Sequence, residues 1–146
     1  TRADGEVAVV DLKWGRAGDR QKLLQKSSYL QLGIYAQLIH QDRGKWPTLG
    51  YFVISDAQLI VLDSDFFPGV PSEKPENGES VLEFWQRVEA TWKWRRSQLD
   101  AGLIEVSVTD TEPDELSNPA DAGLPLPPTD DMYDDFTALT GWGDKE

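Results

Sequence analysis

The chain has 146 residues, the size of one ordinary domain with a hydrophobic core of its own. It contains no cysteine, which excludes disulfides and thiolate metal sites. No apolar run approaches the ~20 residues that cross a bilayer, and the polar start has no apolar core like that of a signal peptide. We therefore expect a soluble, cytoplasmic protein without a membrane partner.

The formal net charge of −12 comes from the end of the chain. Residues 1–99 carry 13 acidic and 13 basic side chains, whereas residues 100–146 carry 13 acidic side chains and a single basic one, Lys145. A strongly acidic protein is ordinarily a poor ligand for nucleic acid, because affinity for phosphates comes from Lys and Arg. The even balance over residues 1–99 weakens that objection.

The first elements expected along the chain are a strand and a long helix. Residues 7–10, Val-Ala-Val-Val, predict a strand that is buried on both faces. Apolar residues then recur at helical spacing over residues 19–41, which predicts one helix. Its main apolar stripe contains Leu23, Leu30, Ile34 and Leu38.

A hairpin and a second helix follow. The apolar runs 51–54 and 59–62 are joined by four residues with turn character, which is typical of a β-hairpin. Residues 64–78, rich in Pro, Gly and Glu, predict a loop. Ser80, with a glutamate three residues later, forms a capping box and predicts a helix over residues 80–99.

The composition divides the chain into a domain over residues 1–104 and an acidic, proline-rich tail over residues 105–146. The tail ends in a small apolar cluster that we expect to dock it. The members of this cluster are Tyr133, Phe136, Leu139 and Trp142.

Asp4-Gly5, just ahead of the first strand, is a dipeptide typical of a hairpin turn, which needs a strand on each side. The sequence holds only the second of these strands. The alternative is a polar start before an edge strand, and the pattern alone does not decide between the two.

The first strand ends in Asp11-Leu12-Lys13. An Asp at the end of a strand can coordinate Mg²⁺ through its carboxylate, while the backbone carbonyl of Leu12 offers a second oxygen. Lys13 shares the face of Asp11 under strand alternation, so its ammonium can hold a water or stabilise phosphate charge beside the metal. The alternative is an exposed ion pair that ends a strand, which by itself is the commoner explanation.

Gln31 and Tyr35 lie one turn apart on the same face of the helix predicted over 19–41. The Gln can reach the metal site or a phosphate, and the Tyr can pack at its rim. The alternative places Tyr35 in the core and makes Gln31 a solvated spacer. We expect Asp11 and Lys13 to point to the same side of the sheet, near Gln31.

The run VVDLKWG at residues 9–15, followed by QKSSYLQLGIYAQLI at 25–39, resembles the RecB/AddB-like branch of the PD-(D/E)XK nuclease superfamily. In that family a strand ending in Asp-x-Lys precedes a helix with Gln-x-x-x-Tyr, and a β-hairpin follows. The resemblance covers roughly residues 5–63. It implies an α/β fold, a mixed sheet flanked by helices, with a restriction-endonuclease-like core that lacks its N-terminal elements.

The resemblance also implies a function: a DNA nuclease of the repair or recombination type that depends on Mg²⁺ or Mn²⁺. Asp11 would be a metal ligand, Leu12 a carbonyl ligand and Lys13 the catalytic lysine, with Gln31 and Tyr35 as the helix motif. DNA would be the partner, and the resemblance leaves open whether a helicase domain or subunit accompanies it.

Two parts of the family pattern are absent. A further metal-binding Asp belongs on the strand paired before this one, and a further acid or His on an earlier helix. We therefore expect the chain to be the C-terminal part of a nuclease domain, inactive in isolation. Some relatives close with cysteines that bind an iron–sulfur cluster, which this chain cannot hold. The alternative function is a non-catalytic nucleic-acid-binding or assembly module that kept the fold.

Overall fold

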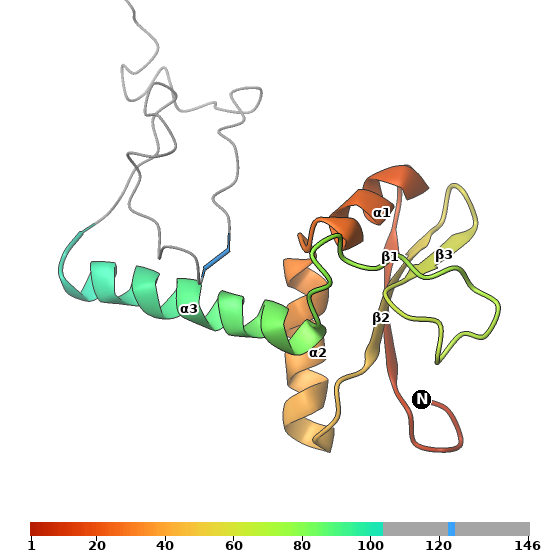
Figure 1. The fold of residues 1–146 in the computed structure, drawn as a ribbon, viewed down its shortest axis with the longest axis horizontal. Helices are drawn as coiled ribbons and strands as arrows, with labels where there is room; N and C mark the ends of the chain where they lie inside the picture. The colour runs from red at the N-terminus through yellow and green to blue at the C-terminus, as the bar shows by residue number, and fades with distance from the viewer. Residues whose placement is uncertain (104–122, 125–146) are drawn as a thin grey trace, which may run out of the picture. The chain divides into compact units, whose positions relative to one another are not determined.

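The structure is a computed structural model that describes residues 1–103 and 123–124. Its elements, in chain order, are β1 (Ala8–Lys13), α1 (Ala17–Gln25), α2 (Leu30–Arg43), β2 (Thr48–Val53), β3 (Gln58–Val61) and α3 (Val81–Asp100) (Figure 1). The backbone divides into two units, Thr1–Gln86 and Arg87–Glu146, and the sheet belongs to the first. In the part of the chain that the structure describes, no helix combines the length and hydrophobicity needed to cross a membrane.

The tail predicted over residues 105–146 lies outside the described residues, apart from 123–124. The predicted docking cluster is among the residues not described. Its place in the molecule stays a prediction.

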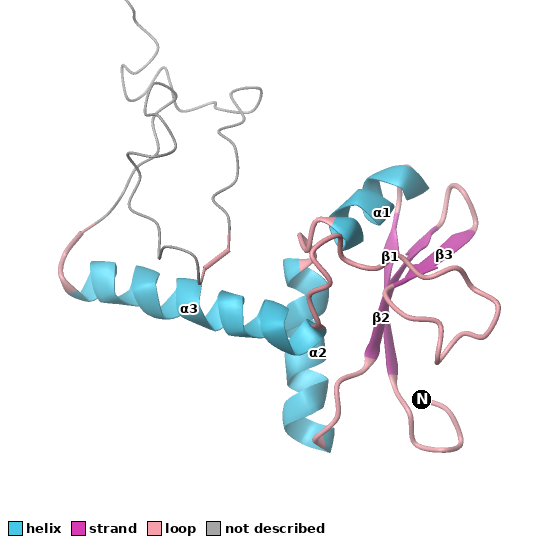
Figure 2. Ribbon diagram, in the orientation of Figure 1, coloured by secondary structure: helices cyan, strands magenta, loops and turns pink. Residues whose placement is uncertain are grey.

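The three strands form one mixed sheet in the order β1-β2-β3. β1 runs parallel to β2, and β2 pairs antiparallel with β3 as the predicted hairpin. Two parallel neighbours need a long crossover connection, which α1 and α2 supply (Figure 2). The predicted α/β class, a mixed sheet flanked by helices, is confirmed.

The helices α1 and α2 cover one face of the sheet. Leu49, Tyr51 and Val53 alternate along β2 on this face, and all are buried. The other face is less protected, because the side chain of Leu12 at the end of β1 is 64% exposed. Residues 7–10 themselves are each only half-buried, so the prediction that they form a strand buried on both faces is wrong. β1 is an edge strand among the described residues, and the helices protect only one of its faces.

The prediction of a single helix over 19–41 is also wrong, because four residues separate α1 from α2. Ser27 in this break has a left-handed φ of +50°, which a continuing helix cannot contain. The break also sets the direction of Tyr29, whose buried ring packs 4.4 Å, centroid to centroid, from that of Phe84. Adjacent serines favour such an interruption, since each has only modest helix propensity.

α2 buries the side opposite its most apolar stripe. Leu32, Gly33 and Ala36 are buried. Gly33 allows a close approach, because a Cβ there would lie 2.5 Å from Cε1 of Phe84. The stripe noted in the sequence points outward instead, with large exposed fractions for Leu30, Ile34 and Leu38.

α3 begins as the capping box predicts. The Ser80 N–H and Oγ–H donate to Oε2 of Glu83, at 2.8 and 2.7 Å, and the Glu83 N–H donates to Oγ of Ser80 at 3.2 Å. These hydrogen bonds to its charged form lower the pKa of Glu83. The helix ends before Gly102, whose φ of +74° closes the last turn.

Candidate functional site

The structure brings together the four side chains that the sequence selected. The Lys13 ammonium lies 3.0 Å from Oδ2 of Asp11 and donates to Oε1 of Gln31 at 2.8 Å. The amide group of Gln31 in turn donates to the hydroxyl of Tyr35 at 2.9 Å. The end of β1 and the first turns of α2 are thus joined by one continuous polar chain.

The ion pair at the start of this chain is largely shielded from solvent. The side chain of Asp11 is 14% exposed and that of Lys13 is 28% exposed. Oδ2 of Asp11 is itself buried, and no described group donates it a hydrogen bond of ordinary geometry, so the ammonium balances its charge without satisfying its lone pairs. The carboxylate therefore keeps acceptor capacity on its buried side.

Tyr51 is a neighbour of this carboxylate that the sequence did not reveal. It pairs with Asp11 in the parallel register of β1 and β2 and is buried. Burial, and then the charge of Asp11, raise the pKa of Tyr51 to about 12, while Arg20 opposes the shift. The phenol is therefore neutral at physiological pH, and its hydroxyl can act as a donor. Only the pairing of strands 40 residues apart brings it here.

The connection after β1 is fastened to the turn between β2 and β3. The Ser55 hydroxyl donates to the carbonyl of Gly15. Oδ2 of Asp56 accepts the N–H of Ala17 at 2.7 Å, which caps the start of α1 from a distant turn. Both contacts fix the chain just after Lys13, and neither was predicted from the sequence.

β1 has a free edge among the described residues. The Thr48 N–H donates to the carbonyl of Val7, and the Ile54 N–H donates to that of Lys13. The odd-numbered residues of β1 thus direct their N–H and C=O groups toward β2. Because these groups alternate in direction along a strand, the N–H and C=O of Leu12 point away from β2. The carbonyl that the resemblance implies as a ligand therefore faces the open edge.

The turn ahead of β1 has the geometry of a three-residue hairpin loop. The Arg2 N–H donates to the carbonyl of Glu6 at 2.9 Å, and the Gly5 N–H donates to that of Arg2 at 3.1 Å. Gly5 has a φ of +86°, as the glycine bulge of such a loop requires. Oδ1 of Asp4 accepts the Glu6 N–H at 3.0 Å and steadies the turn. Of the two alternatives that the sequence left open at Asp4-Gly5, the backbone has the geometry of the hairpin turn.

The described residues offer an incomplete set of metal ligands. Asp11 and the carbonyl of Leu12 supply two oxygens, whereas Mg²⁺ takes six ligands in octahedral geometry. Nowhere in residues 1–103 and 123–124 do three His, Cys, Asp or Glu side chains gather closely enough to hold a metal ion. If a metal ion binds here, water, a substrate phosphate or other residues would have to supply its remaining ligands.

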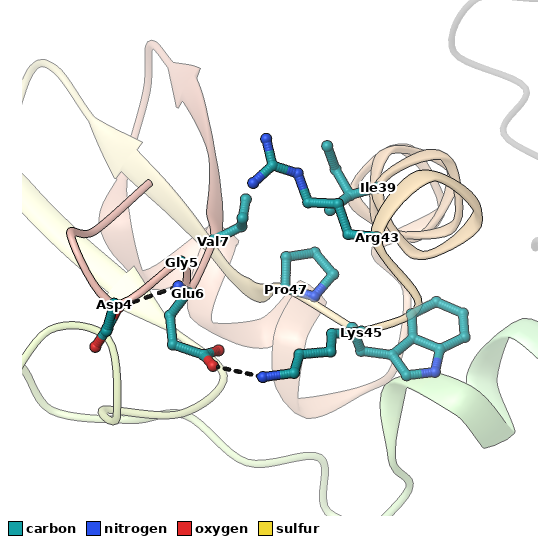
Figure 3. Close-up of a pocket in the computed structure, with 9 residues that line it drawn as sticks. Asp4, Gly5, Glu6, Val7, Ile39, Arg43, Lys45 and Pro47 are labelled. Carbon is teal, nitrogen blue, oxygen red and sulfur yellow. Dashed lines mark hydrogen bonds and ion pairs between the residues drawn. The ribbon is translucent and has the colours of Figure 1, made fainter.

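A pocket of about 210 Å³ lies near the other end of β1 (Figure 3). Its walls include the ion pair between Lys45 and Glu6, at 3.1 Å, and the side chain of Arg43. None of the four residues of the polar chain lines it. Because β1 extends roughly 20 Å between the two ends, the pocket and the polar chain are separate features.

No family model, curated protein or solved structure matches the chain. Its function is therefore inferred from its own residues. Two features bear on that inference: a shielded acid–lysine pair held by an amide, and beside it an edge of β1 that no strand among the described residues pairs with.

Proposed function

We propose that the chain is part of a metal-dependent DNA nuclease with a restriction-endonuclease-like core of the RecB/AddB-like type, active in DNA repair or recombination. The observation that carries the proposal is the polar chain from Asp11 through Lys13 and Gln31 to Tyr35. An exposed ion pair that merely ends a strand would not need an amide and a phenol to orient its lysine.

Lys13 is the group that would act on the phosphate. An ammonium has three N–H donors: one donates to Gln31, while Asp11 pairs with the charge at 3.0 Å without a hydrogen bond of ordinary geometry. A donor that Gln31 does not use can donate to a phosphate oxygen or to an attacking water. Gln31 holds the lysine in place and Tyr35 holds the amide, so the donor is oriented before substrate arrives.

The open edge of β1 suggests where the missing ligands belong. A strand that entered the hairpin turn along this edge would run antiparallel to β1, with Arg2 opposite Glu6. Asp11 lies five residues after Glu6, so its partner would lie five residues before Arg2. Residues directly opposite each other share a face of the sheet. A carboxylate at that position would stand beside Asp11 and add to its oxygen ligands.

The test is DNA cleavage by the full-length protein with Mg²⁺ or Mn²⁺. We expect Asp11→Asn and Lys13→Met each to lower the cleavage rate by about 100-fold or more, in the range found when one preorganised polar group is removed from an active site. Lys45→Met is the matched control, since Lys45 also pairs with a carboxylate at 3.1 Å but lies at the other end of β1. Circular dichroism should show the fold retained. Equal rates in all four proteins would refute the proposal.

A non-catalytic module is the second candidate. Two observations on the described residues favour it. Asp11 and Lys13 pair with each other, and Asp11 belongs to no group of three carboxylate or His side chains that could hold a metal ion. Such a module would bind nucleic acid or a protein partner equally well with and without divalent cations. It would also show no metal-dependent cleavage in the full-length protein, which separates it from the nuclease.

A further inference from the structure

Arg20 is a half-buried cation with no described partner. It lies in the middle of α1, and its Nε atom is buried without a hydrogen-bond acceptor. No carboxylate among the described residues forms an ion pair with it. Such a group is costly to leave unpaired, because a guanidinium carries five donors in a fixed fork.

The guanidinium of Arg20 reaches back toward the end of β1. Its Nη2 atom lies 4.0 Å from the position that a Cβ would occupy at Gly15, two residues after Lys13. Arg20 and Asp11 also act in opposite directions on the pKa of Tyr51, so both charges are felt at the same hydroxyl. The second cation therefore stands on the Lys13 side of the sheet.

Two acids that contact α1 accept hydrogen bonds from residues other than Arg20. Asp56 accepts the N–H at the start of α1. The two carboxylate oxygens of Glu73 accept the side-chain amides of Gln21 and Gln25, at 3.1 and 3.0 Å. Both acids therefore have other hydrogen-bond partners, and Asp11, the acid felt at the same Tyr51 hydroxyl, is paired with Lys13 at 3.0 Å.

We propose that Arg20 is a backbone-binding residue of this site, whose guanidinium takes a non-bridging oxygen of the phosphate next to the one that Lys13 contacts. This inference rests on the proposed function for its ligand, a nucleic-acid strand. Two cations on neighbouring elements suit two successive phosphates, and the planar fork of Arg matches phosphate oxygens in pairs. Such a contact positions the strand without reading its sequence.

The experiment measures binding in EDTA, so that cleavage plays no part. The probe is a short single-stranded DNA of mixed sequence, titrated over a range of salt concentrations. We expect Arg20→Gln to reduce the slope of log affinity against log salt by about 0.7, the value for one single-strand phosphate contact. At 0.1 M salt that slope corresponds to binding about fivefold weaker. The loss should be equal for probes of different sequence.

Two further variants separate the contact from a general effect of charge or folding. Lys22 is exposed on the same helix, about 200° around its axis from Arg20, so Lys22→Gln changes the charge equally and should leave the slope unchanged. Arg20→Lys should keep the slope but lose part of the affinity, because the charge stays and the fork is lost. In the unaltered chain, the ¹⁵N–¹H resonance of the Arg20 Nε should shift on addition of the probe.

Four results would overturn the proposal: no measurable binding by the unaltered chain, an unchanged slope in Arg20→Gln, an equal loss in Lys22→Gln, or a stationary Nε resonance. A lower melting temperature of Arg20→Gln with unchanged binding would show that Arg20 serves only the fold. If Arg20→Gln weakens binding while Asp11→Asn in the full-length protein cleaves normally, the phosphate contact stands and the nuclease proposal falls.

Discussion

The ion pair between Asp11 and Lys13 should be worth more to stability than its exposed counterpart at the other end of β1. Lys45 and Glu6 pair at 3.1 Å, against 3.0 Å for the site pair, so distance is matched. The two pairs differ in solvent exposure: the side chains of Lys13 and Asp11 are 28% and 14% exposed, whereas those of Lys45 and Glu6 are 76% and 44% exposed. Any difference in coupling free energy then reports shielding from solvent.

The expected magnitude follows from two opposing contributions. At 3.0 Å and an effective dielectric constant of 20, Coulomb attraction is about 5 to 6 kcal/mol. The desolvation cost of each charge falls in the single-variant differences and cancels in a double-mutant cycle, but screening by the solvent that still reaches both side chains reduces the attraction to a coupling of about 1 to 2 kcal/mol. For the exposed pair, solvent screening and side-chain entropy leave about 0.5 kcal/mol or less.

A double-mutant cycle measures both couplings. Asp11→Asn, Lys13→Met and the double variant are unfolded in urea and followed by circular dichroism, alongside the same cycle at Glu6 and Lys45. Lys13→Met should cost more than Asp11→Asn, because it leaves the buried Oδ2 of Asp11 without a countercharge. A site coupling no larger than that of the exposed pair would refute this reasoning.

Three further outcomes are expected from the described residues. The raised pKa of Tyr51 means that the folded state favours the neutral phenol. The resulting contribution to the free energy of unfolding, about 3 kcal/mol, is fully present below pH 10 and is lost as pH rises toward about 12. Tyr51→Phe should remove this pH dependence in urea denaturation. Gly33→Ala would press its Cβ against the buried ring of Phe84 and should lower stability by about 1 to 2 kcal/mol, despite the better helix propensity of Ala. Gly5→Ala should cost about 1 kcal/mol through its positive φ alone, since no atom lies within 4 Å of the added Cβ; an unchanged midpoint in either glycine variant would contradict the corresponding expectation.

Local patterns in the sequence were enough to predict the elements whose signals are local. The capping box at Ser80 fixed the start of α3, and the apolar runs on either side of a short turn gave the hairpin. The break between α1 and α2 was missed because it depends on Ser27 adopting a left-handed conformation and on Tyr29 packing against Phe84. Apolar periodicity continues through the break and conceals it.

The residues of the site also fall into those that local spacing predicts and those that only the tertiary structure places. Strand alternation places Asp11 and Lys13 on one face, and a spacing of four places Gln31 and Tyr35 on one helix turn. These spacings predicted which side chains lie together, and the resemblance to the nuclease family selected them as a site. Tyr51 could not be predicted as part of the site from the sequence. It lies beside Asp11 only because β2, after a long crossover, pairs in parallel with β1 in this register. The strand pairing that brings them together is set by tertiary structure.

The most direct measurement of the central claim is the single-turnover rate of DNA cleavage by the full-length protein with Mg²⁺ or Mn²⁺, with the protein in excess over DNA and far above Kd. If Asp11 and Lys13 act on the phosphate, Asp11→Asn should lower this rate by about 100-fold or more while the Kd for DNA changes by less than about threefold. A single-turnover rate in Asp11→Asn equal to that of the unaltered protein would contradict the account, as would a loss that disappears once the protein is saturating.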